Sequence, residues 1–182
     1  MLRITTGKAK NRKLKVPKIK GYRGVQEISK MSLFSILGEK VQNSVCLDLF
    51  AGSGNLGIEA LSRGAGWCDF VDENPASISA INENLAKCGF ESNFEVIRQD
   101  AVKFAANTMR NYDIIFADPF YKDTSHRFLV KNMEMILKDN GIICFFHGEN
   151  LDMESLIKGT NLQIIDKRQF GFSIFSLLKR KG

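Results

Sequence analysis

The sequence predicts one α/β domain built on a mostly parallel β-sheet with helices on both faces. From residue 45 onward, short apolar stretches alternate with stretches of helical periodicity, a pattern typical of parallel strands joined by crossover helices. The chain has 182 residues, 44% of them hydrophobic, which is enough for one sizeable core and too little for two ordinary domains. The last two strands have no helix between them, so we expect an antiparallel hairpin at one sheet edge.

The elements are expected in a regular order along the chain. Residues 26–37 place apolar side chains about one helical turn apart and stop at Gly38, which predicts a short amphipathic helix. Strands are expected at 45–50, 67–71, 94–98, 112–117, 142–146, 162–169 and 173–178, and helices at 56–63, 76–88, 101–109, 125–137 and 153–158. The helix at 76–88 has clear end signals, with Asn74 as N-cap, Pro75 at the first position and Gly89 past the end.

Positive charge is concentrated at the start of the sequence. Residues 1–26, called the basic segment below, contain nine Lys and Arg and no acid, whereas the remaining residues contain 17 basic and 20 acidic side chains. A basic stretch beside a nearly neutral domain is typical of a protein that binds a phosphate backbone, although a solvated, poorly ordered arm is the alternative. The cations expected to contact the nucleic acid are Arg3, Lys8, Lys10, Arg12, Lys13, Lys15 and Arg23.

A glycine-rich turn is expected after the first strand. Gly52, Gly54 and Gly57 match the pattern G-x-G-x-x-G, and Asp72 follows Gly52 by 20 residues, at the end of the next strand. Glycines let the backbone lie against a ligand, and the acid can accept hydrogen bonds from two ribose hydroxyls. The motif therefore predicts an adenine-nucleoside cofactor, but it fits a nicotinamide dinucleotide as well as S-adenosylmethionine.

Asp48, four residues before Gly52, favours S-adenosylmethionine. A carboxylate would repel a pyrophosphate, whereas it attracts a sulfonium and an ammonium group. An unpaired carboxylate buried in a strand by chance would be costly. Asp100, after the third strand, either accepts a hydrogen bond from the adenine amino group or caps the following helix, and both can hold. The expected cofactor contacts are Asp48, Phe50, Gly52, Gly54, Asp72, Asp100 and Ala101.

The fourth strand ends in Asp118-Pro119-Phe120-Tyr121, on the same edge of the sheet as the glycine turn. An amino group on an aromatic ring has a delocalised lone pair, so its N–H needs an acceptor while the nitrogen attacks a methyl group. The Asp118 side chain and the Pro119 carbonyl can supply two acceptors, and Tyr121 can stack on a base. We expect Asp118, Pro119 and Tyr121 to be catalytic and Phe120 to contact the nucleic acid.

These motifs carry a resemblance to a known family. Asp118-Pro-Phe-Tyr121 resembles the Asp-Pro-Pro-Tyr signature of amino-group methyltransferases, and residues 48–65 are similar to the cofactor loop of the RsmD family of bacterial 16S rRNA guanine-N2 methyltransferases. Further matches are Arg3-Ile-Thr-Thr-Gly-Lys8, Arg12-Lys-Leu14 and Ser32-Leu-Phe-Ser35, so the resemblance covers nearly the whole chain. Phe120 departs from the second proline of the signature, and residues 23–30 depart from the usual Arg-Pro-Thr stretch.

The resemblance implies a Rossmann-like class I methyltransferase fold with a seven-stranded sheet. It divides the chain into a basic N-terminal hairpin at residues 1–24, which grips RNA, and a methyltransferase domain at residues 25–182. It also implies S-adenosylmethionine as the cofactor and N2 of a guanine in 16S rRNA as the target, within the 30S subunit or its assembly intermediate.

Two alternatives stay open at the level of sequence. The same acceptors could serve adenine N6 in DNA or RNA, and a protein of this fold could bind rRNA as an assembly factor without turnover. The longest uninterrupted apolar run is far shorter than a membrane span, so we expect a cytoplasmic protein, monomeric and without a membrane partner. We expect no metal, and free, buried thiols at all four cysteines: Cys46, Cys68, Cys88 and Cys144.

Overall fold

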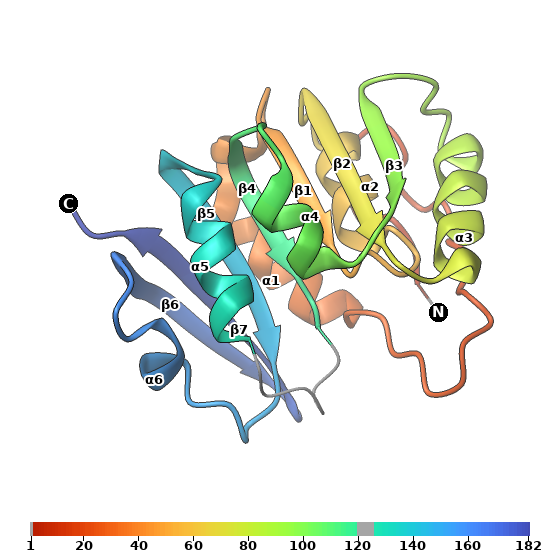
Figure 1. Ribbon diagram of the computed structural model, residues 1–182. Helices are drawn as coiled ribbons and strands as arrows, with labels where there is room; N and C mark the ends of the chain where they lie inside the picture. The colour runs from red at the N-terminus through yellow and green to blue at the C-terminus, as the bar shows by residue number, and fades with distance from the viewer. Residues whose placement is uncertain (1, 120–125) are drawn as a thin grey trace.

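A computed structural model describes residues 2–119 and 126–182, and within them the chain forms a seven-stranded sheet (Figure 1). The strand order is β3-β2-β1-β4-β5-β7-β6. The strands are β1 (Val45–Leu49), β2 (Trp67–Asp72), β3 (Phe94–Arg98), β4 (Tyr112–Ala117), β5 (Leu137–His147), β6 (Leu162–Phe170) and β7 (Ser173–Arg180). β1 to β5 are parallel, whereas β7 is antiparallel to both β5 and β6. The predicted α/β class and the C-terminal hairpin are therefore confirmed.

Helices cover both faces of the sheet and define two halves of the hydrophobic core. They are α1 (Glu27–Leu37), the 3-10 helix η1 (Gly38–Val41), α2 (Asn55–Ser62), α3 (Pro75–Lys87), α4 (Ala101–Asn107), α5 (Arg127–Met135) and α6 (Met153–Ile157). Apolar residues of α1, α2 and α3 pack on one face, and those of α4, α5 and α6 on the other. In Figure 1, α4 and α5 lie in front of the sheet, while α1 and α2 lie behind it.

Most elements begin and end within two residues of the prediction, with one clear exception. β5 begins at Leu137, where the sequence predicts the end of a helix, and it runs 11 residues to His147. Leu137 pairs with Tyr112 ahead of an irregularity in the β4–β5 register, and the polar residues that follow it are exposed. The apolar pattern therefore starts only at Ile142, because the first part of this strand is not covered on both faces.

The end signals of α3 act as predicted. The Asn74 side chain accepts a hydrogen bond from the backbone N–H of Ala76 at 2.9 Å, and Pro75 is the first helical residue. Gly89, just past the helix, has a φ of +77°, which a glycine adopts without strain.

The basic segment packs on the sheet domain. Ile4, Ala9 and Leu14 are buried in the same half-core as α1, α2 and α3. The segment doubles back on itself, with the N–H of Ile4 donating to the Arg12 carbonyl at 3.0 Å and the N–H of Leu14 donating to the Leu2 carbonyl at 2.9 Å. In Figure 1 it runs, in red, along the side of α2 and α3. Because its apolar side chains point inward, most of its cations face solvent.

The four cysteines are free thiols, with Cys46, Cys68 and Cys144 buried and Cys88 half-buried. Burial raises the pKa of Cys46 to about 12, so its thiol stays protonated at neutral pH. Among the described residues, none of the helices has the length and hydropathy needed to cross a lipid bilayer.

Candidate active site

Three carboxylates meet where β1, β2 and β4 end. Leu49, at the end of β1, lies opposite both Val71 of β2 and Ala117 of β4. Asp72 and Asp118 each come one residue later, so they flank the backbone that leaves β1. Asp48 lies one residue before Leu49 and opposite Phe116. The parallel register therefore brings the predicted residues to one edge of the sheet, where ligands bind in open α/β folds.

The turn after β1 has the backbone of a ligand-binding loop. Phe50, Gly52 and Gly54 have φ values of +58°, +56° and +74°. An aromatic residue rarely adopts the left-handed conformation, and such residues cluster at functional sites. Gly57 serves a different purpose, because a Cβ there would lie 2.3 Å from the Phe70 ring. The third glycine of the motif therefore lets α2 pack closely on β2.

Four backbone amides of this turn already have acceptors within the protein. The N–H of Gly52 donates to Asp72 at 2.9 Å, and the N–H of Gly57 donates to Asp48 at 2.8 Å. The Ser53 N–H donates to a tyrosine hydroxyl at 3.0 Å, and the Gly54 N–H donates to a backbone carbonyl at 2.7 Å. A phosphate bound at a glycine turn needs such amides free. The turn is therefore poorly suited to a pyrophosphate, which argues against a dinucleotide cofactor.

The electrostatics of the site favour a cation. Asp48 is 2% exposed, and its burial, together with the nearby carboxylates Asp118 and Asp72, raises its pKa well above the usual range. Burial also raises the pKa of Asp118 to about 7. Among the described residues, no ion pair involves Asp48, Asp72 or Asp118. A cationic ligand placed among these carboxylates would favour their charged forms.

Asp72 is the last residue of β2, and Asp100 follows the neighbouring strand β3 by two residues. The N–H of Gln99 donates to the Asp72 carbonyl at 3.3 Å. The Asp72 side chain accepts from the N–H of Asn74 at 2.9 Å and from the N–H of Gly52. Each carboxylate oxygen therefore accepts one backbone hydrogen bond and retains lone pairs for a ligand. Asp100 accepts from the N–H of Lys103 at 2.8 Å and caps α4, as one of its two interpretations predicts. Contact of Asp100 and the buried Ala101 with adenine stays a prediction.

Of the predicted residues that follow Asp118, the structure describes only Pro119. Pro119 is buried next to Asp118, at the end of β4. Phe120 and Tyr121 lie outside the described residues, so their predicted roles stay predictions.

Five of the seven cations predicted to bind RNA are exposed and take part in no ion pair among the described residues. These are Lys8, Lys10, Arg12, Lys13 and Arg23. The other two are paired: Arg3 with Glu27 at 2.7 Å, and Lys15 with Glu83. Their charge is partly neutralised, so each of the five unpaired cations can attract a phosphate more strongly.

A buried polar network next to the turn was not apparent from sequence. The side chains of Lys30 and Glu59 are 1% and 0% exposed and form an ion pair at 2.8 Å. Lys30 also donates to Asn55 and to the Arg3 carbonyl, both at 2.7 Å. Glu59 accepts from the N–H of Thr5 at 2.9 Å, which ties the basic segment to α2. The only local signal for this network is an acid inside a helix that is otherwise almost entirely apolar or small.

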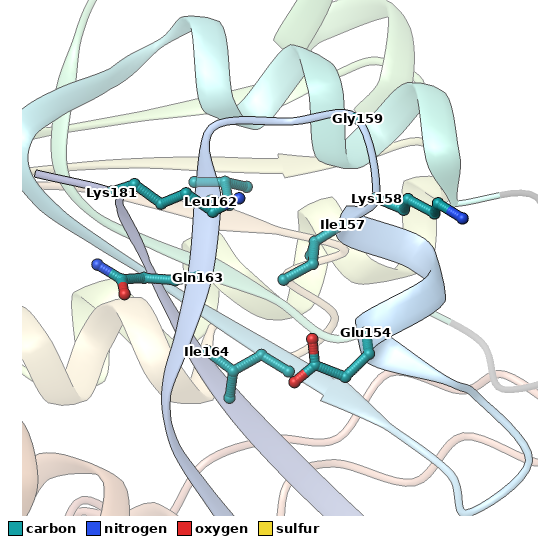
Figure 2. Close-up of a pocket in the computed structure, with 8 residues that line it drawn as sticks. All are labelled: Glu154, Ile157, Lys158, Gly159, Leu162, Gln163, Ile164 and Lys181. Atoms are coloured by element: carbon teal, nitrogen blue, oxygen red, sulfur yellow. The ribbon is translucent and has the colours of Figure 1, made fainter.

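A separate cavity of about 360 Å³ lies between α6 and β6 (Figure 2). Glu154, Ile157 and Lys158 line one side of it, and Leu162 and nearby β6 residues line the other. Leu162 pairs with Arg180 at the end of β7, a strand antiparallel to β5, so this cavity lies toward the edge where the parallel strands begin. It contains none of the predicted site residues.

The chain is similar to known proteins over nearly its whole length. The family model described as Conserved hypothetical protein 95 matches residues 2–179. The Bacillus subtilis (strain 168) protein YlbH is 31% identical over 186 residues, which cover 100% of both chains. Ribosomal RNA small subunit methyltransferase D of Escherichia coli (strain K12) is 35% identical over 142 residues, or 77% of this chain and 68% of that protein. The solved structure of Escherichia coli YhhF matches with a TM-score of 0.85 and 27% identity, over 99% and 98% of the two chains.

Proposed function

Since the chain belongs to the RsmD family, that of ribosomal RNA small subunit methyltransferase D, we propose that it methylates the exocyclic N2 of a guanine in 16S rRNA, using S-adenosylmethionine. One observation carries the proposal. Asp118 lies one residue beyond the Leu49–Ala117 pair, so an acceptor for an amino group stands on the strand next to Asp48 and the glycine turn. A methyl donor and an aromatic amine could therefore meet at this edge of the sheet.

The residues around the turn fit S-adenosylmethionine by their chemistry. When bound, this cofactor supplies a methyl group on a positively charged sulfur. Asp48 and Asp118 would favour that charge, and Asp72 would accept hydrogen bonds from the ribose hydroxyls. Gly52 and Gly54 would let the ligand approach the backbone, and Phe50, Asp100 and Ala101 would line the adenosine side.

Asp118 and Pro119 would orient the target amine. A guanine flipped out of the RNA would place its N2 hydrogens on the Asp118 carboxylate and the Pro119 carbonyl. Hydrogen bonds from the N–H groups to these oxygens increase the electron density on the nitrogen and make it a better nucleophile, and the carboxylate can take the proton afterwards. Tyr121 would stack on the base, which is worth about 1–3 kcal/mol per base in comparable sites, and Phe120 would contact the RNA beside it.

The unpaired cations of the basic segment would hold the RNA backbone. Lys8, Lys10, Arg12, Lys13 and Arg23 are exposed on the segment that packs beside α2, the helix that follows the glycine turn. Phosphate contacts of this kind position RNA without reading its sequence. We infer that the substrate is the 30S subunit or an assembly intermediate of it.

Transfer of a labelled methyl group from S-adenosylmethionine to 30S particles, followed by mass spectrometry of the nucleosides, tests the proposal. The expected product is N2-methylguanosine in 16S rRNA, with the Asp118→Ala variant as an inactive control. N6-methyladenosine would refute the guanine target. Absence of label in any nucleoside, while rRNA binding persists, would favour an assembly factor without turnover.

A further inference from the structure

Tyr22, in the basic segment, contacts the glycine turn directly. Its hydroxyl accepts a hydrogen bond from the Ser53 N–H at 3.0 Å and lies 3.1 Å from the Ser53 hydroxyl oxygen. A Cβ added to Gly52 would lie 2.6 Å from the edge of the Tyr22 ring. Gly52 is therefore small for two reasons, its positive φ and the aromatic ring against it.

The same phenol is half-buried against the glycine turn. Burial is the main cause that raises the pKa of Tyr22, and the carboxylates of Asp118 and Asp48 raise it further. Tyr22 therefore links the glycine turn to the segment that contains the cations predicted to bind RNA.

A second contact links Ser53 to the basic segment. Asn84 of α3 is fully buried, and its amide donates to the Ser53 carbonyl at 2.8 Å and to the Lys15 carbonyl at 2.9 Å. Its side-chain oxygen accepts from the Lys15 N–H at 2.7 Å. Both backbone polar groups of Ser53 are therefore bound to the segment, one through Tyr22 and one through Asn84.

We propose that Tyr22 is a positioning residue through which RNA binding on the basic segment strengthens binding of S-adenosylmethionine at the glycine turn. The inference rests on the proposed function. Phosphates bound by Arg23, or by Lys18 and Lys20, two further exposed lysines of the basic segment, would restrict the backbone on either side of Tyr22. Tyr22 in turn binds the Ser53 amide. A turn that is already ordered loses less entropy when the cofactor binds. By linkage, the cofactor strengthens RNA binding by the same factor.

Calorimetric titration with S-adenosylhomocysteine tests the positioning role. Tyr22→Phe keeps the ring and removes the hydrogen bond to Ser53, so its affinity should fall about three- to tenfold. Tyr112→Phe is the matched control, because it also removes one tyrosine hydrogen bond, which the Tyr112 hydroxyl donates to Asp69 at 2.7 Å. Tyr112 is the first residue of β4, at the opposite end of the strand from Asp118. The control should bind as the wild type does. Equal or tighter binding by Tyr22→Phe would overturn the proposal.

The same titration in the presence of excess 16S rRNA transcript tests the coupling. The wild-type affinity for S-adenosylhomocysteine should rise about fivefold or more, and that of Tyr22→Phe by less than twofold. In methyl transfer to 30S particles, Tyr22→Phe should raise the KM for S-adenosylmethionine more than it lowers kcat. An equal effect of rRNA on both proteins would mean that Tyr22 does not transmit the coupling.

The outcomes separate this inference from the proposed function. If the wild type takes up no S-adenosylhomocysteine, the cofactor assignment fails, and this inference fails with it. If the wild type binds the ligand and transfers label while both Tyr22→Phe and Tyr22→Ala behave as wild type, only the role of Tyr22 fails. Thermal unfolding of each variant checks that the fold is retained.

Discussion

The Asp48 carboxylate accepts a hydrogen bond from the backbone N–H of Gly57 at 2.8 Å, which joins β1 to α2 across the glycine turn. This one hydrogen bond only partly offsets the cost of burial, because the pKa of Asp48 stays well above its usual range. A charged Asp48 is therefore unfavourable in the free protein and favourable beside a cation. Asp48 therefore makes a structural hydrogen bond and also provides a site where a bound cation is favoured.

Asp48→Asn separates these two contributions. The amide oxygen can still accept from Gly57, while the negative charge is lost. We expect affinity for S-adenosylmethionine to fall on the order of tenfold, and affinity for S-adenosylhomocysteine, which lacks the sulfonium, to fall less. Calorimetry with both ligands measures the difference. Equal losses for the two ligands would contradict attraction of the sulfonium charge.

The same variant should be more stable than the wild type at pH 8. An acid whose pKa is raised by folding contributes stability below its unfolded pKa, near 4, and loses that contribution as the pH rises through the raised value. Removing the acid should then raise the free energy of unfolding at pH 8 by about 1–3 kcal/mol, the cost of a poorly compensated buried polar group. Urea denaturation at pH 8 and pH 4 checks both the gain and its disappearance.

The pH dependence of methyl transfer should follow the ionisation of Asp118. Its carboxylate form is the acceptor for the amine, and its pKa is raised to about 7. We expect kcat/KM for S-adenosylmethionine, which reports the ionisations of the free enzyme, to rise between pH 6 and pH 8 with a midpoint near 7. Asp118→Asn should lose about 10²- to 10⁴-fold in rate and show no such rise, while it still binds S-adenosylhomocysteine. A midpoint unchanged in the variant would assign the ionisation to another group.

Lys30→Met should destabilise the protein by up to about 3–5 kcal/mol, because it removes the buried partner of Glu59 and leaves that carboxylate, among the described residues, only its ion pair with Arg63, at 2.8 Å. Lys138→Met is the control, since the Lys138–Asp113 pair is 42% and 36% exposed. Loss of such a surface pair costs less than about 1 kcal/mol. Urea unfolding of the two variants under one condition gives the comparison. Similar losses would show that the Lys30 network contributes little.

Neutralising Lys10 and Lys13 should weaken binding to 16S rRNA and reduce its dependence on salt. Each lost phosphate contact lowers the slope of log affinity against log salt by about 0.7–0.9, so the double Gln variant should lose about 1.5. Lys131 and Lys158, exposed on α5 and just after α6, provide a double Gln control of equal net charge. Filter binding across a salt series measures both. If the control loses as much as the variant, the effect is one of net charge alone.

The position of the site at the strand ends could be predicted from sequence, because the carboxyl ends of parallel strands lie at the same edge of a sheet. Asp48, Asp72 and Asp118 each stand at or near the carboxyl end of a buried parallel strand, and such ends share an edge. The strands themselves are recognisable because each is covered on both faces and is nearly continuous in apolar residues. β5 shows the limit of this signal, since its first four residues pair with β4 or extend past it while largely exposed.

The contacts of Tyr22 and Asn84 could not be predicted in this way. Both reach Ser53 from 31 residues away along the chain. No local spacing encodes such a contact, because it depends on how the basic segment crosses α2 and α3. A lone aromatic residue among cations was the only visible sign, and it is equally typical of a surface loop.

β7 is inserted between β5 and β6, although it is synthesised after both. Until it emerges from the ribosome, β5 presents an open edge and β6 has no neighbour to pair with. Unpaired edges of this kind are sites of aggregation during synthesis. Translation pausing or truncation ahead of residue 173 should therefore yield chains that depend on chaperones, even though every residue of the proposed catalytic edge has already been made.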